Sequence, residues 1–330
     1  MTLSQPRLSI ITINYNNAEG LRKTLASVAS QTYPNIEHII VDGASTDGSV
    51  DVIKEYENQL NITHSTIHLL WSSEPDNGIY NAMNKGIEIA LGKRIVNSFN
   101  RSERSEDKNK ENEIALGKRV VNAFNRSERS EDKNKELPDY IQILNSGDLL
   151  AAPNVTERMM AALQMKGDGV ELLYGNMVKY DYQNSRTLGK STEVEYSLHQ
   201  YYTATMNHDC CYIRRDLFET YGLYDESLKI VSDWKWFLQA IGLGNVKPIY
   251  VDIDVTIFDA SGISETNLAL RNQERRQVLE ELVPPAILAD YDAHAFEMEQ
   301  MKRLRRWKLY PLVYFIERVL LKLEKWKILR

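Results

Sequence analysis

The chain has 330 residues, of which 43% are hydrophobic and 26% are charged. This composition is typical of a globular protein with a sizeable core, and it excludes a chain that is disordered or fibrous throughout. The net charge of −6 also excludes a nucleic-acid binder that works through bulk positive charge.

Three strand–loop–helix units follow one another in the first part of the chain. Apolar, β-branched runs predict buried strands at Leu8–Ile13, Ile36–Val41 and Ile67–Trp71. Each run leads into a polar loop and then into a helical pattern, over residues 21–28, 50–56 and 79–90 in turn. Repetition of this unit predicts an α/β fold with a parallel sheet.

A tandem duplication interrupts this rhythm. Residues 88–111 and 113–136 are copies that differ at two of 24 positions. In the segment 93–136, 21 of 44 residues are charged, so it cannot bury enough apolar surface to form a core of its own. We predict a surface insertion, and we expect it to be dispensable because it joins a helix to the amino end of a strand, away from the expected ligand edge.

The regular pattern resumes at Tyr140–Leu144, which predicts a fourth strand. Further strands are expected at 172–174, 210–213 and 246–258, and helices at 155–163, from Asp233 onward and at 264–282. We therefore expect residues 1–265 to form the main domain and residues 266–330 a helical C-terminal extension.

The loops after the four N-terminal strands carry Tyr15, Asp42, Asp76 and Asp148. In an open α/β sheet, ligands bind beyond the carboxyl ends of the strands. Several carboxylates at one edge repel one another, and a bound cation or hydrogen-bond donors on a ligand would relieve that repulsion. The structural alternative is that Asp and Asn simply suit turns and helix N-caps.

A second acidic pair, Asp252 and Asp254, has the spacing Asp-x-Asp. Alternation along a strand places both side chains on one face. We expect them to be solvated or capped, and not to form a metal site.

Several segments, in this order, carry a resemblance to a known family: LSIITINYNN, HIIVDGASTDGS, SEPDNGIYNAMNKGIEIALG and YIQILNSGD. They resemble the nucleotide-sugar domain of family-2 glycosyltransferases of bacterial polysaccharide synthesis, and NHDCCYIRRDLF and IVSDWKWFL resemble its acceptor half. The resemblance implies the GT-A fold, a Rossmann-like sheet with helices on both faces. It also implies an inverting, hexosyltransferase-like enzyme that moves a sugar from a nucleotide-diphosphate sugar, with UDP expected, to a hydroxyl of a glycan or lipid-linked acceptor.

The resemblance also assigns roles to individual residues. Tyr15, Asp42 and Asp76 match positions that bind the nucleotide sugar, and His208 matches a position near the acceptor. It assigns the cation site and the catalytic base to two further acids, Asp148 and Asp233.

Asp148 matches the last acid of the family's Asp-x-Asp region, which holds a divalent cation, Mg²⁺ or Mn²⁺. Asp233 matches the catalytic base, which takes the proton of the attacking hydroxyl. Where relatives carry further acids, this chain has other residues, at Gly43, Asn145, Gly147 and Ser232. We therefore expect modest metal affinity, with most ligands supplied by the donor phosphates.

Two other classes remain open. A sugar nucleotidylyltransferase also uses a parallel sheet, a nucleotide and Mg²⁺, but it needs a Gly-rich basic loop where this chain has NYNNAE. A non-catalytic sugar-binding protein on the same fold would not need to retain both Asp148 and Asp233. Measuring UDP released from UDP-sugars separates all three.

The C-terminal residues 302–330 carry ten Lys or Arg against two Glu. A helix here would separate an apolar face (Leu312, Phe315, Ile316, Val319, Leu323 and Trp326) from a basic one (Arg318, Lys322 and Lys325). This combination is typical of a helix in a membrane interface. The alternative is a helix packed on the catalytic domain or on a dimer partner.

The expected location follows from three further observations. The chain has no run of 18 apolar residues, no N-terminal signal pattern, and only two cysteines, Cys210 and Cys211, which are adjacent and form no disulfide framework. We expect a cytoplasmic protein, bound peripherally to the inner face of the cell membrane through residues 302–330.

Overall fold

The protein was studied as a computed structural model that describes residues 5–95, 139–167, 169–182, 184–194, 196–259, 267–306 and 310–328. Apart from residues 93–95, the predicted insertion 93–136 lies outside these ranges, so its dispensability stays a prediction. The chain divides into two compact units, Met1–Glu274 and Arg275–Arg330.

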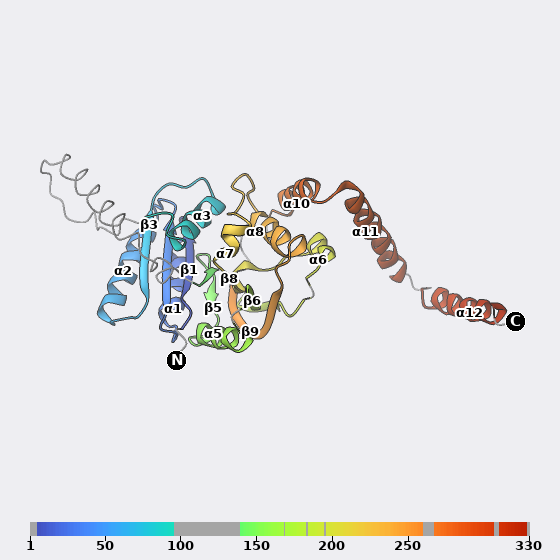
Figure 1. Cartoon of the computed structure of the whole chain (residues 1–330), viewed down its shortest axis with the longest axis horizontal. Helices are drawn as coiled ribbons and strands as arrows, with labels where there is room; N and C mark the ends of the chain where they lie inside the picture. The colour runs from blue at the N-terminus through green and yellow to red at the C-terminus, as the bar shows by residue number, and fades with distance from the viewer. Residues whose placement is uncertain are drawn as a thin grey trace, which may run out of the picture. The chain divides into compact units, whose positions relative to one another are not determined.

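A single mixed sheet organises the first unit (Figure 1). Its strands within the described ranges run in the order β3-β2-β1-β4-β8-β6-β9-β5, with β7 paired to β6. The strands are β1 Leu8–Asn14, β2 Ile36–Asp42, β3 His68–Ser73, β4 Tyr140–Ile143, β5 Leu149–Leu150, β6 Leu172–Asp181, β7 Arg186–Lys190, β8 Cys211–Arg214 and β9 Pro248–Asp259.

The N-terminal half of this sheet is parallel, as the repeated strand–loop–helix units predict. β1 pairs in parallel with both β2 and β4, and β2 pairs in parallel with β3. The register places Asn14 beside Asp42 and Asp42 beside Ser73, so three strand ends meet at one edge. The other half is mixed, because β5, β7 and β8 pair antiparallel with their neighbours.

Helices of the first unit connect and cover these strands. They are α1 Ala18–Ala29, α2 Ser49–Ile62, α3 Ile79–Ala90, α5 Val155–Lys166, α6 Leu198–Thr203, α7 Asp216–Thr220 and α8 Ser232–Phe237, with a 3₁₀ turn at His208–Cys210 and a π-helical turn at Leu238–Gly242. α3 packs against β1 and β2. A Cβ atom at Gly86 of α3 would overlap the Ile11 side chain, so glycine allows this close approach.

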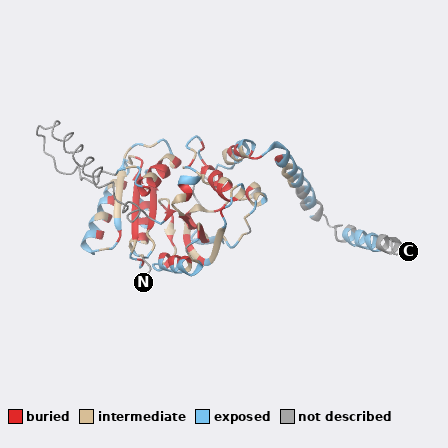
Figure 2. Cartoon of the chain, in the orientation of Figure 1, coloured by how far each residue is buried: buried red, intermediate tan, exposed pale blue. Residues whose placement is uncertain are grey.

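The core lies around β1, β2 and β4, whose residues are all buried (Figure 2). His38 is a polar side chain inside it with a partner on each side of its ring. His38 lies 3.0 Å from the Thr12 hydroxyl on one ring nitrogen and 3.0 Å from the Tyr56 hydroxyl on the other. Burial lowers the pKa of His38 to about 3, so the ring is neutral at physiological pH and has a structural role in the core.

The second unit is helical. α10 spans Leu268–Leu282 and continues from the first unit, followed by α11 Pro285–Arg305 and α12 Tyr310–Ile328. The Arg276 guanidinium joins α10 to α11 through the Asp292 carboxylate, at 2.8 and 2.9 Å. Among the helices described, none combines the length and the apolar character needed to cross a membrane.

Candidate functional site

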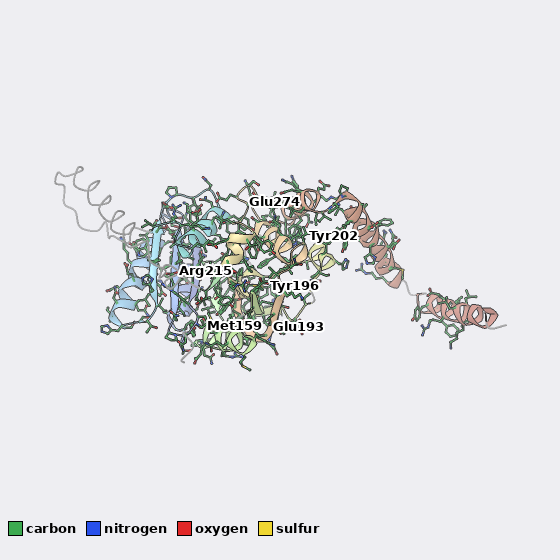
Figure 3. All side chains as sticks on the ribbon, viewed as in Figure 1. Met159, Glu193, Tyr196, Tyr202, Arg215 and Glu274 are labelled. Carbon is green, nitrogen blue, oxygen red and sulfur yellow. The ribbon has the colours of Figure 1, made fainter. Side chains whose placement is uncertain are left out.

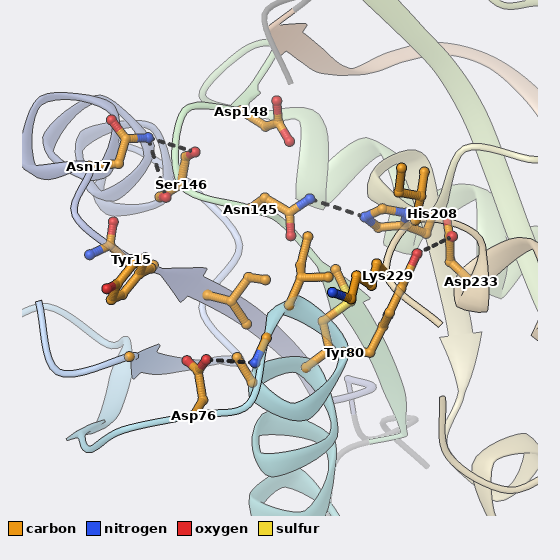
Figure 4. A pocket seen from close by; sticks show the side chains of 18 of the residues that line it. Tyr15, Asn17, Asp76, Tyr80, Asn145, Ser146, Asp148, His208, Lys229 and Asp233 are labelled. Atoms are coloured by element: carbon orange, nitrogen blue, oxygen red, sulfur yellow. Dashed lines mark hydrogen bonds and ion pairs between the residues drawn. The ribbon is translucent and has the colours of Figure 1, made fainter. Parts of the chain in front are cut away.

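A cavity of about 900 Å³ opens at the carboxyl ends of the parallel strands (Figure 4). Its walls come from the loops after β1, β2, β3 and β4, from α3, and from the ends of β9 and the segment before α8. This is the edge at which open α/β sheets bind ligands, and the volume suits a small-molecule ligand. Five of the six predicted site residues line it, namely Tyr15, Asp76, Asp148, His208 and Asp233.

The sixth predicted residue, Asp42, is fully buried and does not line the cavity. Its Oδ1 accepts hydrogen bonds from the Asn14 amide at 2.8 Å and the Ser45 hydroxyl at 2.6 Å. Its Oδ2 accepts from the Ser45 backbone N–H at 2.9 Å and the Ser73 hydroxyl at 2.7 Å. Asp42 therefore ties together the ends of β1, β2 and β3, and its direct contact with a ligand stays a prediction.

One end of the cavity is formed by Tyr15, Gly43 and Asp76. The Tyr15 ring is 66% exposed and therefore free to stack on a planar ligand. The Asp76 Oδ1 accepts from the Gly78 N–H at 2.9 Å, at the start of α3. A Cβ atom at Gly43 would overlap Asp76 Oδ2 and approach Tyr15 Cδ2 to 3.1 Å. An acid at this position, which the resemblance implies for relatives, would require the Asp76 carboxylate to move.

A chain of hydrogen bonds forms the other end. The Tyr80 hydroxyl donates to Asp233 Oδ1 at 2.8 Å, and His208 Nδ1 lies 3.0 Å from Asp233 Oδ2. On the far side of the ring, the Asn145 amide lies 3.3 Å from His208 Nε2. Asp233 also stands where the bland interpretation of an acid at a helix start is a plain N-cap, but α8 begins at Ser232 with Val231 at the N-cap, so that interpretation is wrong. Its carboxylate is instead held at the cavity wall.

The pKa shifts of Asp233 and His208 favour an ion pair between these two side chains. Burial opposes the charged form of Asp233, but hydrogen bonds from His208 and Tyr80 outweigh it and hold the pKa of Asp233 below its usual value. Burial also opposes a charged His208, yet the carboxylates of Asp233, Asp209 and Asp148 together raise the pKa of His208 to about 8. At neutral pH the pair is therefore an imidazolium and a carboxylate, with the proton acceptor ionised.

Tyr80 completes the chain as a proton donor. Burial, reinforced by the adjacent Asp233 carboxylate, raises the pKa of Tyr80 well above its usual value. The phenol therefore stays protonated at physiological pH and points its O–H at Asp233. With His208 on the second oxygen, Tyr80 fixes the direction in which the carboxylate faces.

Asp148 is the most buried of the cavity acids, with 4% of its surface exposed. Its Oδ1 accepts from the Asp259 backbone N–H at 3.0 Å. Burial and the nearby charge of Asp209 raise the pKa of Asp148 well above its usual value. A cation would stabilise the ionised form of such a carboxylate.

The donor set fits a cation shared with a ligand. Asp148 and Asp259 both line the cavity. The described part of the chain contains no cluster of three or more His, Cys, Asp or Glu residues that could hold a metal by itself. Hard divalent cations prefer oxygen ligands, so a cation bound here would need further oxygens from a bound ligand.

The acidic pair Asp252 and Asp254 does not line the cavity. The Asn176 amide donates to both carboxylates, at 2.8 and 3.1 Å, and the Lys190 ammonium group forms ion pairs with both. The two side chains thus lie on one face of β9, where they are partly exposed and share one ammonium group. The two cysteines are buried free thiols.

Sequence reasoning missed three cavity residues, Tyr80, Lys229 and Asp259. Tyr80 lies in the quoted segment GIYNAM, and Lys229 comes four residues before Asp233, but neither position has a spacing rule that marks it. Asp259 directly follows the predicted strand 246–258 and is the last residue of β9, but no motif marks it. These three residues become candidates for a function only because the fold places them in the cavity wall beside the predicted site residues.

Comparison with known proteins places the cavity in context. Residues 9–98 match the family described as Glycosyl transferase family 2. The chain is similar to the uncharacterized glycosyltransferase Rv1514c of Mycobacterium tuberculosis (strain ATCC 25618 / H37Rv), with 25% identity over 266 residues, 79% of this chain and 78% of the relative. It is also similar to TuaG of Bacillus subtilis (strain 168), named for teichuronic acid biosynthesis, with 36% identity over 96 residues, 29% of this chain and 36% of TuaG.

Two solved structures share the fold. One is S. aureus TarS 1-349 in complex with UDP-GlcNAc, with a TM-score of 0.53 and 16% identity, covering 83% of this chain and 64% of that one. The other is the mannosyltransferase PcManGT from Pyrobaculum calidifontis in complex with GDP-Man and Mn²⁺, with a TM-score of 0.53 and 15% identity, covering 88% and 70%.

Proposed function

Because the chain is a family-2 glycosyltransferase with the GT-A fold, we propose that it transfers a sugar from a nucleotide-diphosphate sugar to an acceptor hydroxyl, with inversion at the anomeric carbon. The observation that carries the proposal is the oriented, ionised Asp233 at one end of the cavity, opposite Tyr15 and Asp76. A single carboxylate that accepts a proton from an attacking hydroxyl suits direct displacement, which inverts the reacting carbon.

In this proposal the donor lies along the cavity. The exposed Tyr15 ring stacks on the nucleobase, and Asp76 accepts hydrogen bonds from the nucleoside. Asp42 acts beneath them by holding the three loops in place. Asp148 and Asp259 would hold a divalent cation, which when bound would neutralise negative charge on the leaving group.

Transfer then needs one proton acceptor. The acceptor oxygen forms a bond to the anomeric carbon as the bond to the diphosphate oxygen breaks, and the bonding electron pair leaves with the nucleoside diphosphate. The hydroxyl proton passes to Asp233, while Tyr80 and His208 keep its carboxylate aimed.

The names of similar proteins support the choice of substrates. TarS is solved with UDP-GlcNAc and PcManGT with GDP-Man and Mn²⁺, which supports a nucleotide-sugar donor and a divalent cation. TuaG is named for teichuronic acid biosynthesis, which supports a glycan or lipid-linked acceptor in surface polysaccharide synthesis. UDP is the first nucleotide to test.

The experiment is a donor panel. The protein is incubated with UDP-sugars and GDP-mannose in Mg²⁺ or Mn²⁺, with and without glycan and lipid-linked acceptors, and released nucleoside diphosphate is measured. We expect acceptor-dependent release of UDP from one donor. Pyrophosphate release from UTP and a sugar phosphate would indicate a nucleotidylyltransferase, and donor binding without release would indicate a sugar-binding protein.

The donor geometry gives a prediction at Gly43. The Gly43→Ala change is expected to weaken nucleotide binding about tenfold, a loss of about 1.4 kcal/mol, because the added methyl displaces Asp76 and Tyr15. Calorimetric titration measures the affinity, and thermal unfolding checks that the fold is intact. Gly189→Ala is the control, because a Cβ there meets nothing within 4 Å. Equal affinity of the Gly43→Ala and wild-type proteins would contradict the packing argument.

We also propose that α12 binds the inner surface of the cell membrane. Its exposed apolar side chains include Leu312, Phe315, Ile316 and Leu320. The sequence 302–330 has a net charge of +8, which complements anionic lipid. Each basic residue near such a surface contributes about 1 kcal/mol, and the apolar side chains add burial in the interface. Within this basic segment, Trp307 and Lys308 lie outside the described residues.

Truncation tests this proposal. The full chain and a form ending at residue 300 are sedimented with vesicles of anionic or of zwitterionic lipid. We expect the full chain to sediment with anionic vesicles only, and the truncated form with neither kind of vesicle. In 0.5 M salt the full chain should return to the supernatant, because salt screens the attraction between basic residues and lipid and the apolar contacts alone are too weak to hold it. A full chain that stays in the supernatant at low salt contradicts the proposal, and concentration-dependent dimers lost on truncation would identify α12 as a dimer contact.

A further inference from the structure

Lys229 is the one lysine or arginine among the described residues that line the cavity. Its side chain is exposed, and within the described ranges no hydrogen bond or ion pair engages its ammonium group. Neighbouring lysines differ: the Lys85 Nζ donates to the Pro75 carbonyl at 2.8 Å, and the Lys235 Nζ to the Asp225 carboxylate at 2.8 Å. Those two stabilise the fold, whereas Lys229 is available to a ligand.

The backbone at Lys229 is fixed by a buried carboxylate. Glu274 of α10, labelled in Figure 3, is 6% exposed. Its two oxygens accept from the Lys229 N–H at 2.8 Å and the Ile230 N–H at 2.9 Å. Charge-assisted bonds of this kind hold a loop firmly. Lys229 is therefore presented from a fixed position on the same segment that carries Asp233.

The cavity around this ammonium group is acidic. Asp76, Asp148, Asp233 and Asp259 line it, and the second basic group, His208, is paired with Asp233 (Figure 4). A ligand with negative charge would be repelled by these carboxylates unless a cation faces it. Among the described residues, Lys229 supplies the permanent positive charge there.

We propose that Lys229 binds the diphosphate of the nucleotide-sugar donor and stabilises the charge that develops on it during transfer. This inference rests on the proposed function, which makes the diphosphate the charged part of the donor. The nucleobase and the ring hydroxyls need no cation, and no feature of the described cavity requires a charged acceptor. The diphosphate is thus the group that the free ammonium complements.

The role is electrostatic and involves no proton transfer. As the bond between the anomeric carbon and the diphosphate oxygen breaks, the electron pair and an additional negative charge pass to that oxygen. The ammonium group of Lys229 attracts this charge more strongly than the charge of the intact donor, so it favours the transition state. The hydroxyl proton goes to Asp233, as before.

Lys229→Met and Lys229→Arg test the inference in the full chain with Mg²⁺ present. We expect Lys229→Met to bind UDP at least about tenfold more weakly than wild type, from the loss of a charge-assisted contact, and to bind uridine equally. Lys229→Arg, which keeps the charge, should stay within about threefold of wild type for UDP. Lys54→Met is the matched control, because Lys54 is exposed on α2 and does not line the cavity.

The outcomes separate this inference from the proposed function. Calorimetry measures UDP and GDP binding, and ligand-observed NMR measures the weaker nucleosides. Tight UDP binding by wild type with no loss in Lys229→Met overturns the role of Lys229 and leaves the donor class intact. A change confined to the KM of the acceptor assigns the ammonium group to the acceptor and also overturns it. Failure of wild type to bind either diphosphate removes the proposed function itself.

Discussion

Asp233→Asn is expected to lower kcat by about 10³-fold, the scale of a lost general base, and to leave donor affinity within about threefold of wild type. The amide has nearly the size of the carboxylate, and it can still accept the hydrogen bond from Tyr80, but it does not take up a proton at neutral pH. Turnover is measured as acceptor-dependent release of nucleoside diphosphate, and donor affinity by calorimetry.

A surface variant controls for the change of charge. Asp51→Asn alters an exposed carboxylate in the first turn of α2, outside the cavity, and should keep wild-type turnover. An Asp233→Asn protein with near-normal kcat would show that the base is another group. A variant that fails to bind donor would show that Asp233 supports the cavity wall.

The same substitution has a pH signature. In the folded protein the pKa of His208 is raised to about 8 from 6.5. A raised pKa adds stability that is present in full below pH 6.5 and is lost as pH rises through 8. Without the Asp233 charge the pKa of His208 should fall, so the stability of Asp233→Asn should decline less than that of wild type between these pH values. Thermal unfolding across this window measures the difference.

Asp148→Asn is expected to weaken Mn²⁺-dependent donor binding about 100-fold, the upper scale for damaged metal sites, because an amide oxygen replaces the charged ligand. The same change should raise Tm in EDTA by about 2–4 °C, or about 1 kcal/mol. Burial raises the pKa of Asp148, so the ionised carboxylate costs stability at neutral pH when no cation is bound. The amide keeps an oxygen to accept from the Asp259 N–H.

This pair of opposite effects distinguishes a functional acid from a structural one. Calorimetry with and without Mn²⁺ measures donor affinity, and thermal unfolding in EDTA measures stability. Donor affinity that still depends on Mn²⁺ as in wild type would place the cation elsewhere. A fall of Tm in EDTA would mean that the Asp148 carboxylate stabilises the fold instead of serving a ligand.

The sequence determined those features that depend on local pattern. Apolar, β-branched runs, turn residues and helical spacing predict β1 to β4 within a few residues and α3 over 79–90 in full. The predicted helix 50–56 covers only the first part of α2, which continues to Ile62. Parallel pairing brings the carboxyl ends of such strands to one edge. Tyr15, Asp76 and Asp148 therefore line one cavity, as expected from the loops that carry them.

Tertiary structure decided how the second half of the sheet is built. β6 runs to Asp181 and pairs with β7, whereas the sequence predicts a strand only over 172–174. Half-exposed strand residues and a short exposed partner leave little apolar alternation to detect. The antiparallel strands β5, β7 and β8 depend on such pairing partners, which lie far away in the chain.

Tertiary structure also decided the roles within the site. Asp42 carries the same sequence signal as Asp76, yet it is buried in a hydrogen-bond cluster between three strands. Tyr80 and Asp233 are 153 positions apart in the sequence, yet they share a hydrogen bond. Glu274 accepts a hydrogen bond from the Lys229 N–H, 45 positions away. Sequence patterns describe residues that are neighbours along the chain. The pKa values of the site residues and the orientation of their side chains depend instead on groups that only the folded protein brings within hydrogen-bonding distance.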